Sequence, residues 1–296
     1  MKKARFILKK INKEVLIKTA MGLGAFLIVF GSYAVNRKVP TLNVLTSPKI
    51  PIIMYHSVLD NSSRTSKYVV TPEILRRDFD YIKENGFTPI LSQDLIDFSE
   101  NGTPLPEKPI IITFDDGYFN NYTYVFPILK EYGFKAVLSI VGEYSCEFSE
   151  QGAVLNNNYS HCTFDQLNEM SKSGFFEIAC HSFDLHNFST RKGILRKTGE
   201  DKKWYKEFLI NDTLKIKELI SVKTEKEPVA YTYPFGAINS EAENIIKSSG
   251  FKVTYGCEEG VNTITSDPNT LLNLKRYNRD GKYETEEFFK KLLSRM

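Results

Sequence analysis

The stretch Pro109–Tyr118, PIIITFDDGY, joins an apolar run to two adjacent carboxylates and a glycine. Residues 110–114 are mostly β-branched or aromatic, a pattern that predicts a buried strand of a parallel sheet. Such sheets bind their ligands at the carboxyl ends of the strands, where Asp115 and Asp116 stand. Gly117 can adopt backbone conformations that other residues rarely reach. The stretch therefore predicts a functional site, although on its own it also fits a turn with solvated carboxylates.

Three of the four histidines also follow strand-like runs. His56 comes after Ile50–Tyr55, and His181 and His186 come after the apolar run 175–179. One carboxylate and two imidazoles match the ligand set of a catalytic zinc site, which keeps one position for water. A spacing of five residues does not suit one helix face, so we expect His186 to reach the metal from a loop or the first turn after the strand. Any one of these histidines alone fits a hydrogen-bonded core or surface residue, whereas the three together predict a metal site.

Three motifs resemble those of a known enzyme family. Thr113–Gly117 (TFDDG) resembles the first signature of the polysaccharide deacetylases, carbohydrate esterase family 4 with the NodB-homology domain. His181–His186 (HSFDLH) resembles the second, and Tyr231–Gly236 (YTYPFG) is similar to the third, a turn that borders the substrate groove. The resemblance covers residues 49–277. It implies a metal-dependent hydrolase that removes N-acetyl groups from an extracellular N-acetylglucosamine-containing polysaccharide, of the poly-N-acetylglucosamine or peptidoglycan type. Zinc is the first metal expected, and cobalt, nickel or iron also suit the ligands.

The resemblance also assigns roles to individual residues. Asp115 would be the general base, and the main-chain N–H of Phe235 would help to hold the oxyanion. The five-residue step of the second motif resembles the branch that deacetylates poly-N-acetylglucosamine. In that branch the histidine of a Met-Tyr-His sequence, here His56, protonates the departing amine. The metal ligands implied are Asp116, His181 and His186.

Two features depart from the family pattern. No histidine follows His186, so only His56 or His161 is left to act as the acid. The third motif lacks the arginine that often precedes its proline, and Arg276 is our candidate for the group that orients the base. The missing arginine leaves a catalytically inactive, cell-surface polysaccharide-binding protein as the main alternative. A glycosidase is disfavoured, because its two flanking carboxylates have little use for a two-histidine motif.

The N-terminus predicts a membrane anchor. Residues 1–18 carry seven basic residues and one acidic residue, so the positive net charge of the chain, +3, comes from this segment. The remaining sequence has no excess of basic residues that would indicate a nucleic-acid partner. Residues 19–35 are uncharged and apolar, and at about 1.5 Å per residue they approach the thickness of a bilayer. The positive flank predicts a single-pass signal-anchor in the cell membrane with an extracellular catalytic domain, and secretion after signal cleavage is the alternative. Residues 36–49 are predicted to be a linker, and residues 50–296 one deacetylase domain.

Within that domain, strand-like and helix-like segments alternate. This order predicts parallel crossovers and hence an incomplete or distorted (β/α) barrel. The first helix is expected to begin after Thr71 and to end at Asn85-Gly86, as its capping residues indicate. The predicted strands are 50–55, 87–91, 110–114, 135–141, 175–181, 229–233 and 251–255, and the later helices are 92–100, 122–132, 163–173, 202–221 and 240–248.

The remaining features allow more than one interpretation. Cys146 and Cys162 bracket a polar insertion and could close it with a disulfide outside the cytosol, whereas Cys180 and Cys257 fit buried strand positions. His161, in the insertion, fits the surface. A basic cluster with Trp204-Tyr205 fits a solvated helix start or a rim that contacts a polymer; its members are Arg191, Lys192, Arg196, Lys197, Lys202 and Lys203. The aromatic residues expected either to stack on sugar rings or to lie in the core are Tyr118, Phe119, Phe183 and Phe235.

Overall fold

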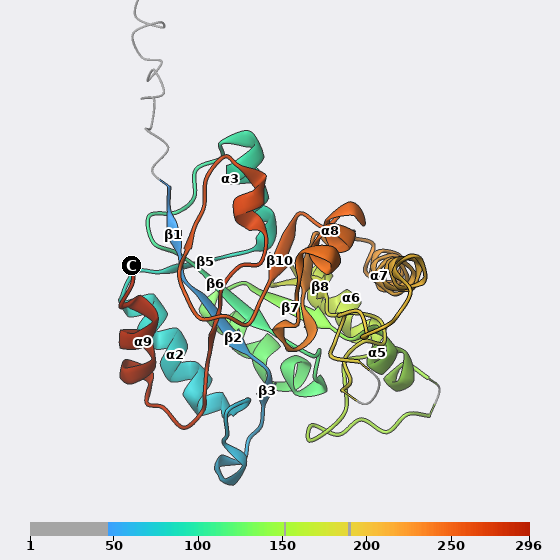
Figure 1. Ribbon diagram of the computed structural model, residues 1–296. Helices are drawn as coiled ribbons and strands as arrows, with labels where there is room; N and C mark the ends of the chain where they lie inside the picture. Colours follow the sequence, from blue (N-terminus) through green and yellow to red (C-terminus); the bar gives the residue numbers. More distant parts are fainter. Residues whose placement is uncertain (1–46, 151, 189–190) are drawn as a thin grey trace, which may run out of the picture. The chain divides into compact units, whose positions relative to one another are not determined.

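The computed structural model describes residues 47–296 apart from residues 151, 189 and 190 (Figure 1). Contacts within the chain group Ser47–Met296 into one unit. The predicted basic segment 1–18, the predicted membrane helix 19–35 and most of the predicted linker 36–49 lie outside the described residues. In the part that is described, no helix is both long enough and apolar enough to cross a bilayer.

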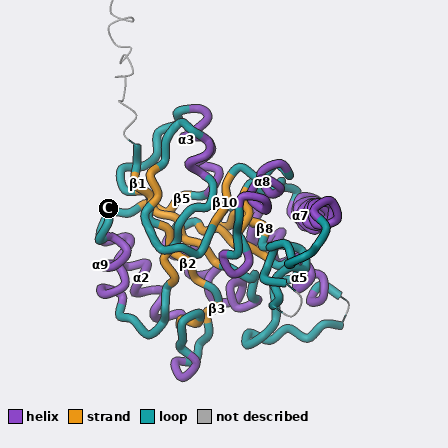
Figure 2. The backbone as a smooth tube through the Cα atoms, in the orientation of Figure 1, coloured by secondary structure: helices purple, strands orange, loops and turns teal. Residues whose placement is uncertain are grey.

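A parallel eight-stranded sheet forms the centre of this unit, with the helices around it (Figure 2). The strand order is β10-β9-β8-β7-β6-β2-β12, and β5 pairs with the first half of β6. Every pairing in this sheet is parallel, which confirms the predicted distorted (β/α) barrel. The strands are β2 Ile52–Tyr55, β5 Thr88–Ile90, β6 Pro109–Phe114, β7 Ala136–Ile140, β8 Phe176–Cys180, β9 Ala230–Thr232, β10 Val253–Tyr255 and β12 Tyr277–Asn278.

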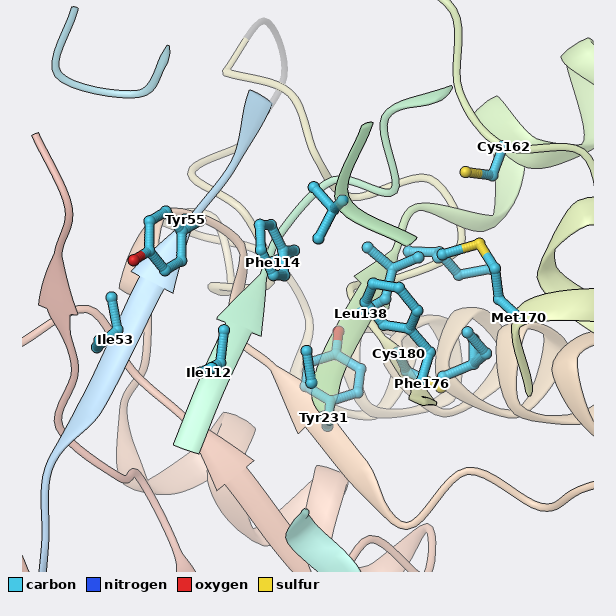
Figure 3. Packing of buried hydrophobic residues seen from close by; sticks show 14 of the residues in the cluster. Ile53, Tyr55, Ile112, Phe114, Leu138, Cys162, Met170, Phe176, Cys180 and Tyr231 are labelled. Carbon is cyan, nitrogen blue, oxygen red and sulfur yellow. The ribbon is translucent and has the colours of Figure 1, made fainter. Parts of the chain in front are cut away.

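Both faces of the sheet are buried, which is why its strands have nearly continuous apolar sequences. Along β6, Ile112 and Phe114 belong to one hydrophobic cluster and Ile111 belongs to another, so successive side chains point to opposite faces. Figure 3 shows the first cluster crossing neighbouring strands, where Phe114 stacks on Tyr55 and meets Phe176 edge to face. This packing fixes the strand ends from which the site is built.

The helices begin and end largely where their capping residues predict. The Thr71 hydroxyl accepts a hydrogen bond from the N–H of Ile74, and Pro72 occupies the first position of α2. Helix α2 packs beside the C-terminal helix α9, which the sequence did not predict (Figure 1). The helices are α2 Pro72–Glu84, α3 Ser92–Asn101, α4 Phe126–Tyr132, α5 Gly142–Phe148, α6 Phe164–Lys172, α7 Lys202–Thr224, α8 Ser240–Ser248 and α9 Thr285–Leu293.

A segment near the C-terminus connects the two edge strands of the sheet. The N–H of Leu274 donates to the carbonyl of Thr254 in β10, and the carbonyl of Leu274 accepts from Gly256. Three residues later, β12 pairs with β2 at the other edge. Residues 274–278 therefore span the gap in the barrel and carry Arg276 into its interior, where the sequence predicted no strand.

Two expectations about individual residues are wrong, and one possibility that we left open is not realised. Cys146 lies in helix α5 and Cys162 is buried, and neither forms the disulfide that we considered. Cys257 is exposed just after β10, because that strand ends at Tyr255, whereas Cys180 is buried as predicted. His161 is buried rather than on the surface, because its ring packs between aromatic side chains.

Candidate active site

The ends of the central strands bring the predicted site residues into one cavity of about 550 Å³. His56 follows β2, the two aspartates follow β6, and His181 follows β8, so three parallel strands deliver side chains to the same edge of the sheet. His186 comes from the loop after β8, as its five-residue spacing predicted. The cavity is lined by Met54, His56, Lys67, Tyr68, Asp115, Asp116, Tyr118, His181, His186, Phe188, Phe235, Cys257, Glu259 and Asn278.

Asp116, His181 and His186 form a group that can hold a metal ion. Each offers one ligand atom, and these atoms lie within 4.8 Å of one another. Oδ1 of Asp116 stands 3.5 Å from Nε2 of His181 and 3.2 Å from Nε2 of His186. The same Oδ1 is buried without a hydrogen-bond partner among the described residues. A buried carboxylate oxygen facing two imidazole nitrogens fits a divalent cation such as zinc.

The orientation of this group is set by the backbone. Asp116 has a φ of 72°, a left-handed conformation that turns its side chain back toward the strand ends. Nδ1 of His181 donates to the carbonyl of Thr232 at 2.8 Å, which leaves Nε2 as the nitrogen with a free lone pair. Burial raises the pKa of Asp116 to about 6, and a cation bound beside this carboxylate would lower that pKa by favouring the ionised form.

Asp115 is clamped by Arg276. Nη1 and Nη2 of Arg276 donate to Oδ1 and Oδ2 of Asp115, each at 2.8 Å, and Nε donates to the carbonyl of Gly256 at 2.8 Å. Asp115 is only 2% exposed, and Arg276 is fully buried. Burial by itself raises the pKa of Asp115, but the charge and hydrogen bonds of Arg276 outweigh burial and hold this pKa well below its usual range. The carboxylate is therefore ionised and fixed in orientation, and the contact that we expected from Arg276 is present.

His56 forms another wall of the cavity. Its ring lies 4.7 Å from the ring of Tyr68, and its main-chain carbonyl accepts from the side-chain amide of Asn121 at 3.0 Å. Nδ1 of His56 is buried without a partner in the described part of the chain. Figure 1 places β2, which ends just before His56, beside β6, which ends just before the aspartates.

The third motif forms an aromatic edge of the cavity. Phe235 has a φ of 60°, and its ring packs 4.4 Å from the ring of His186 and 3.9 Å from the ring of Phe188. Pro234 is buried beneath it. This left-handed backbone holds the ring of Phe235 against His186, at the edge of the group formed by Asp116, His181 and His186.

Some predicted residues do not reach the cavity. Tyr118 and Phe235 line it, whereas Phe119 and Phe183 are not among the lining residues. His161 lies behind the cavity wall, where its ring stacks on that of Tyr118. The basic cluster is partly neutralised, because Arg191 pairs with Glu200 and Arg196 pairs with Glu241. Five further lining residues were not predicted from the sequence. Four lie on loops without a recognisable pattern, namely Lys67, Tyr68, Phe188 and Glu259, and Asn278 lies in the two-residue strand β12.

The sequence matches known proteins across most of the described unit. The chain is 27% identical over 241 residues to poly-beta-1,6-N-acetyl-D-glucosamine N-deacetylase of Escherichia coli (strain K12), which covers 74% of this chain and 36% of that protein. It is 25% identical over 239 residues to the protein of the same name from Staphylococcus aureus (strain COL), with 77% of each chain covered. The chain thus spans about a third of the length of the Escherichia coli relative.

Solved structures share the fold, and half of the chain matches a described family. The de-N-acetylase from Aggregatibacter actinomycetemcomitans superposes with a TM-score of 0.70 at 26% identity, covering 83% of this chain and 100% of that chain. The Streptococcus pyogenes deacetylase PplD, solved in complex with acetate, has a TM-score of 0.66 at 21% identity, with 83% and 99% covered, and shares the fold. Residues 102–254 match the family described as Polysaccharide deacetylase. This chain belongs to the polysaccharide deacetylase family.

Proposed function

We propose that the protein is a metal-dependent hydrolase that removes N-acetyl groups from an N-acetylglucosamine-containing polysaccharide. One observation supports this proposal above all: two features lie in the same cavity. The first is the group of Asp116, His181 and His186, and the second is the carboxylate of Asp115, which Arg276 holds through two hydrogen bonds. The relatives named above act on poly-beta-1,6-N-acetyl-D-glucosamine, and we extend that substrate class to this chain as part of the proposal.

The group formed by Asp116, His181 and His186 would hold a divalent metal, for which zinc is the first candidate. When bound, such a metal polarises the acetyl carbonyl and lowers the pKa of a bound water. Asp115 then accepts a proton from the attacking water, because its carboxylate is ionised and Arg276 fixes its direction. An Arg-bound carboxylate is a weak base, and its contribution is to place the accepting oxygen before the reaction begins.

Two residues act on the other atoms of the amide. His56 gives a proton to the departing amine, so that the products are acetate and a free amino sugar. The main-chain N–H of Phe235 stabilises the negative charge that develops on the acetyl oxygen. Both residues line the same cavity as Asp115, which supports a concerted use of these groups on one acetamido substituent.

The proposal for the location of the protein rests on the sequence alone. We propose a single-pass anchor at residues 19–35 that holds the catalytic domain outside the cell, where a polysaccharide is accessible. Release by signal cleavage would place the same domain in the same compartment. Fusing residues 1–46 to a reporter that is active only outside the cytoplasm distinguishes export from retention.

The test is acetate release by the full chain from N-acetylglucosamine oligomers with β-1,6 and β-1,4 linkages, with added zinc or with EDTA. Zinc-dependent release from either oligomer is the expected result, and a preference for the β-1,6 linkage favours poly-N-acetylglucosamine over β-1,4-linked polymers as the substrate. No acetate from either oligomer with folded, zinc-loaded protein would refute the enzyme. The non-catalytic polysaccharide-binding alternative would then be tested by binding to the same oligomers.

A further inference from the structure

A carboxylate from a distant part of the chain holds the loop between the two histidines of the metal group. Asp212 lies in the middle of α7. Its Oδ1 accepts a hydrogen bond from the N–H of Phe183 and its Oδ2 accepts one from the N–H of Asp184, each at 2.9 Å. Burial raises the pKa of Asp212 to about 6, so the side chain is ionised at neutral pH. Hydrogen bonds to an ionised acceptor are stronger than those to a neutral one. The carboxylate of Asp212 therefore binds the two consecutive N–H groups of the loop strongly to helix α7.

The loop needs external partners because its backbone belongs to no regular element. Ser182 has a φ of 74°, a left-handed conformation that is unfavourable for a residue other than glycine. The carbonyls of Ser182 and Phe183 accept hydrogen bonds from the N–H groups of Gly142 and Glu143, at the start of α5. Helix α5 thus satisfies these two carbonyls, Asp212 satisfies the N–H groups of residues 183 and 184, and the Ser182 hydroxyl accepts from the N–H of Leu185.

The packing at this junction leaves little room for another arrangement. A Cβ atom at Gly142 would stand 2.6 Å from Cδ1 of Ile216 and 2.8 Å from Cδ2 of Phe183. Ile216 lies one helical turn after Asp212, on the same face of α7. The same stretch of α7 therefore fixes the loop twice, through hydrogen bonds from Asp212 and through close packing around Gly142.

We propose that Asp212 is a positioning residue for the metal centre, because it fixes the loop conformation that carries His186 to the point where Asp116 and His181 meet. The inference rests on the proposed function, in that it takes this group to be a metal site. Asp212 touches no ligand atom and acts through the backbone of residues 183 and 184. Outer partners of metal ligands commonly change affinity by about 10- to 100-fold, and a partner that acts through the loop belongs at the lower end of that range.

The experiment measures zinc affinity of the full chain by competition with a chromophoric chelator. Asp212→Ala should raise the Kd for zinc by about tenfold or more, and should change the visible absorption of the cobalt-loaded protein. In the metal-free protein, amide hydrogen exchange in residues 181–187 should become faster. Ile220→Ala is the matched control, because Ile220 is buried on α7 two turns beyond Asp212; it should lower the melting temperature and leave the Kd unchanged.

Wild-type zinc affinity in a folded Asp212→Ala protein would overturn the inference and leave the proposed function intact. Absence of zinc binding by the wild-type chain would instead refute the metal site itself, and the inference with it. If the alanine variant does not fold, Asp212→Asn replaces it. In this variant an NH2 group, which cannot accept, replaces one of the two carboxylate oxygens and faces a main-chain N–H. Zinc binding should therefore weaken severalfold, and an unchanged Kd would equally overturn the inference.

Discussion

Replacing Arg276 by methionine should destabilise the protein by about 3–5 kcal/mol, because it leaves the buried carboxylate of Asp115 without a counter-charge. Both oxygens of that carboxylate accept from Arg276 at 2.8 Å, and only 2% of the residue is exposed to water. The guanidinium also donates to Thr113 and to the carbonyl of Gly256, so its loss frees further buried acceptors. Methionine has a similar volume, which keeps the packing contribution small.

A double-mutant cycle isolates the pair. Asp115→Asn, Arg276→Met and the double variant are compared by urea unfolding of the metal-free full chain, so that metal binding does not enter the measured free energy. The double variant removes both charges, and we therefore expect it to be more stable than the sum of the single effects predicts, by about 2–3 kcal/mol. Arg276→Lys should restore only part of the loss, since an ammonium cannot bind both carboxylate oxygens in the same planar geometry.

Activity provides the second measurement on the same variants. Arg276→Met should lower kcat for acetate release by about 100-fold. Without Arg276 the carboxylate of Asp115 is no longer held in the direction in which it accepts the proton of the attacking water. Zinc affinity should stay near the wild-type value, since Arg276 contacts none of the three proposed ligands directly. Single effects that add within about 0.5 kcal/mol would refute the account of the pair, and wild-type kcat in Arg276→Met would refute the role of Arg276 in catalysis.

Three other predictions concern the metal, the acid and a half-buried glutamate. EDTA should abolish acetate release and lower the melting temperature, and zinc should restore both, since a bound ion stabilises the folded state; activity that persists in EDTA contradicts this. His56→Ala should lower kcat on amides by about 100-fold or more, and far less on aryl acetates, whose leaving group needs no proton; equal losses on both contradict the acid role. Burial raises the pKa of Glu177 from 4.5 to about 7, so the folded state binds more protons than the unfolded state between these two values. The free energy of unfolding should therefore fall by about 3 kcal/mol as the pH rises from 4.5 to 7. Glu177→Gln should remove this slope in urea titrations, and an unchanged slope would show that another group causes it.

The site could be predicted where it depends on local sequence. The strand before Asp115 is recognisable because its residues are buried on both faces and therefore all apolar. His56 and His181 could be placed because parallel strands end at one edge, so residues that follow such strands meet. The loop position of His186 followed from a spacing that does not suit one helix face.

The roles of other residues could not be predicted from the sequence, because they depend on contacts between distant segments of the chain. Arg276 was only a candidate, because β12 has two residues and its position is set by its partners in β2 and by the segment after β10. His161 looks like a polar loop residue, and its burial arises from aromatic rings that other segments supply. Asp212 sits in a long, mostly polar helix, where nothing in the neighbouring sequence marks it as the partner of a loop almost thirty residues earlier. The partners of Arg276, His161 and Asp212 come from distant parts of the chain, and these side chains reach them only in the folded structure.

Zinc content and acetate release, determined side by side for the wild-type full chain and for Asp115→Asn, decide whether Asp115 is the general base of a metal-dependent deacetylase. We predict that both proteins bind one equivalent of zinc, that the wild type releases acetate and free amino groups in equal amounts from N-acetylglucosamine oligomers, and that the variant releases almost none. Comparable acetate release by the zinc-loaded variant would show that Asp115 is not the base and would contradict the account of this site.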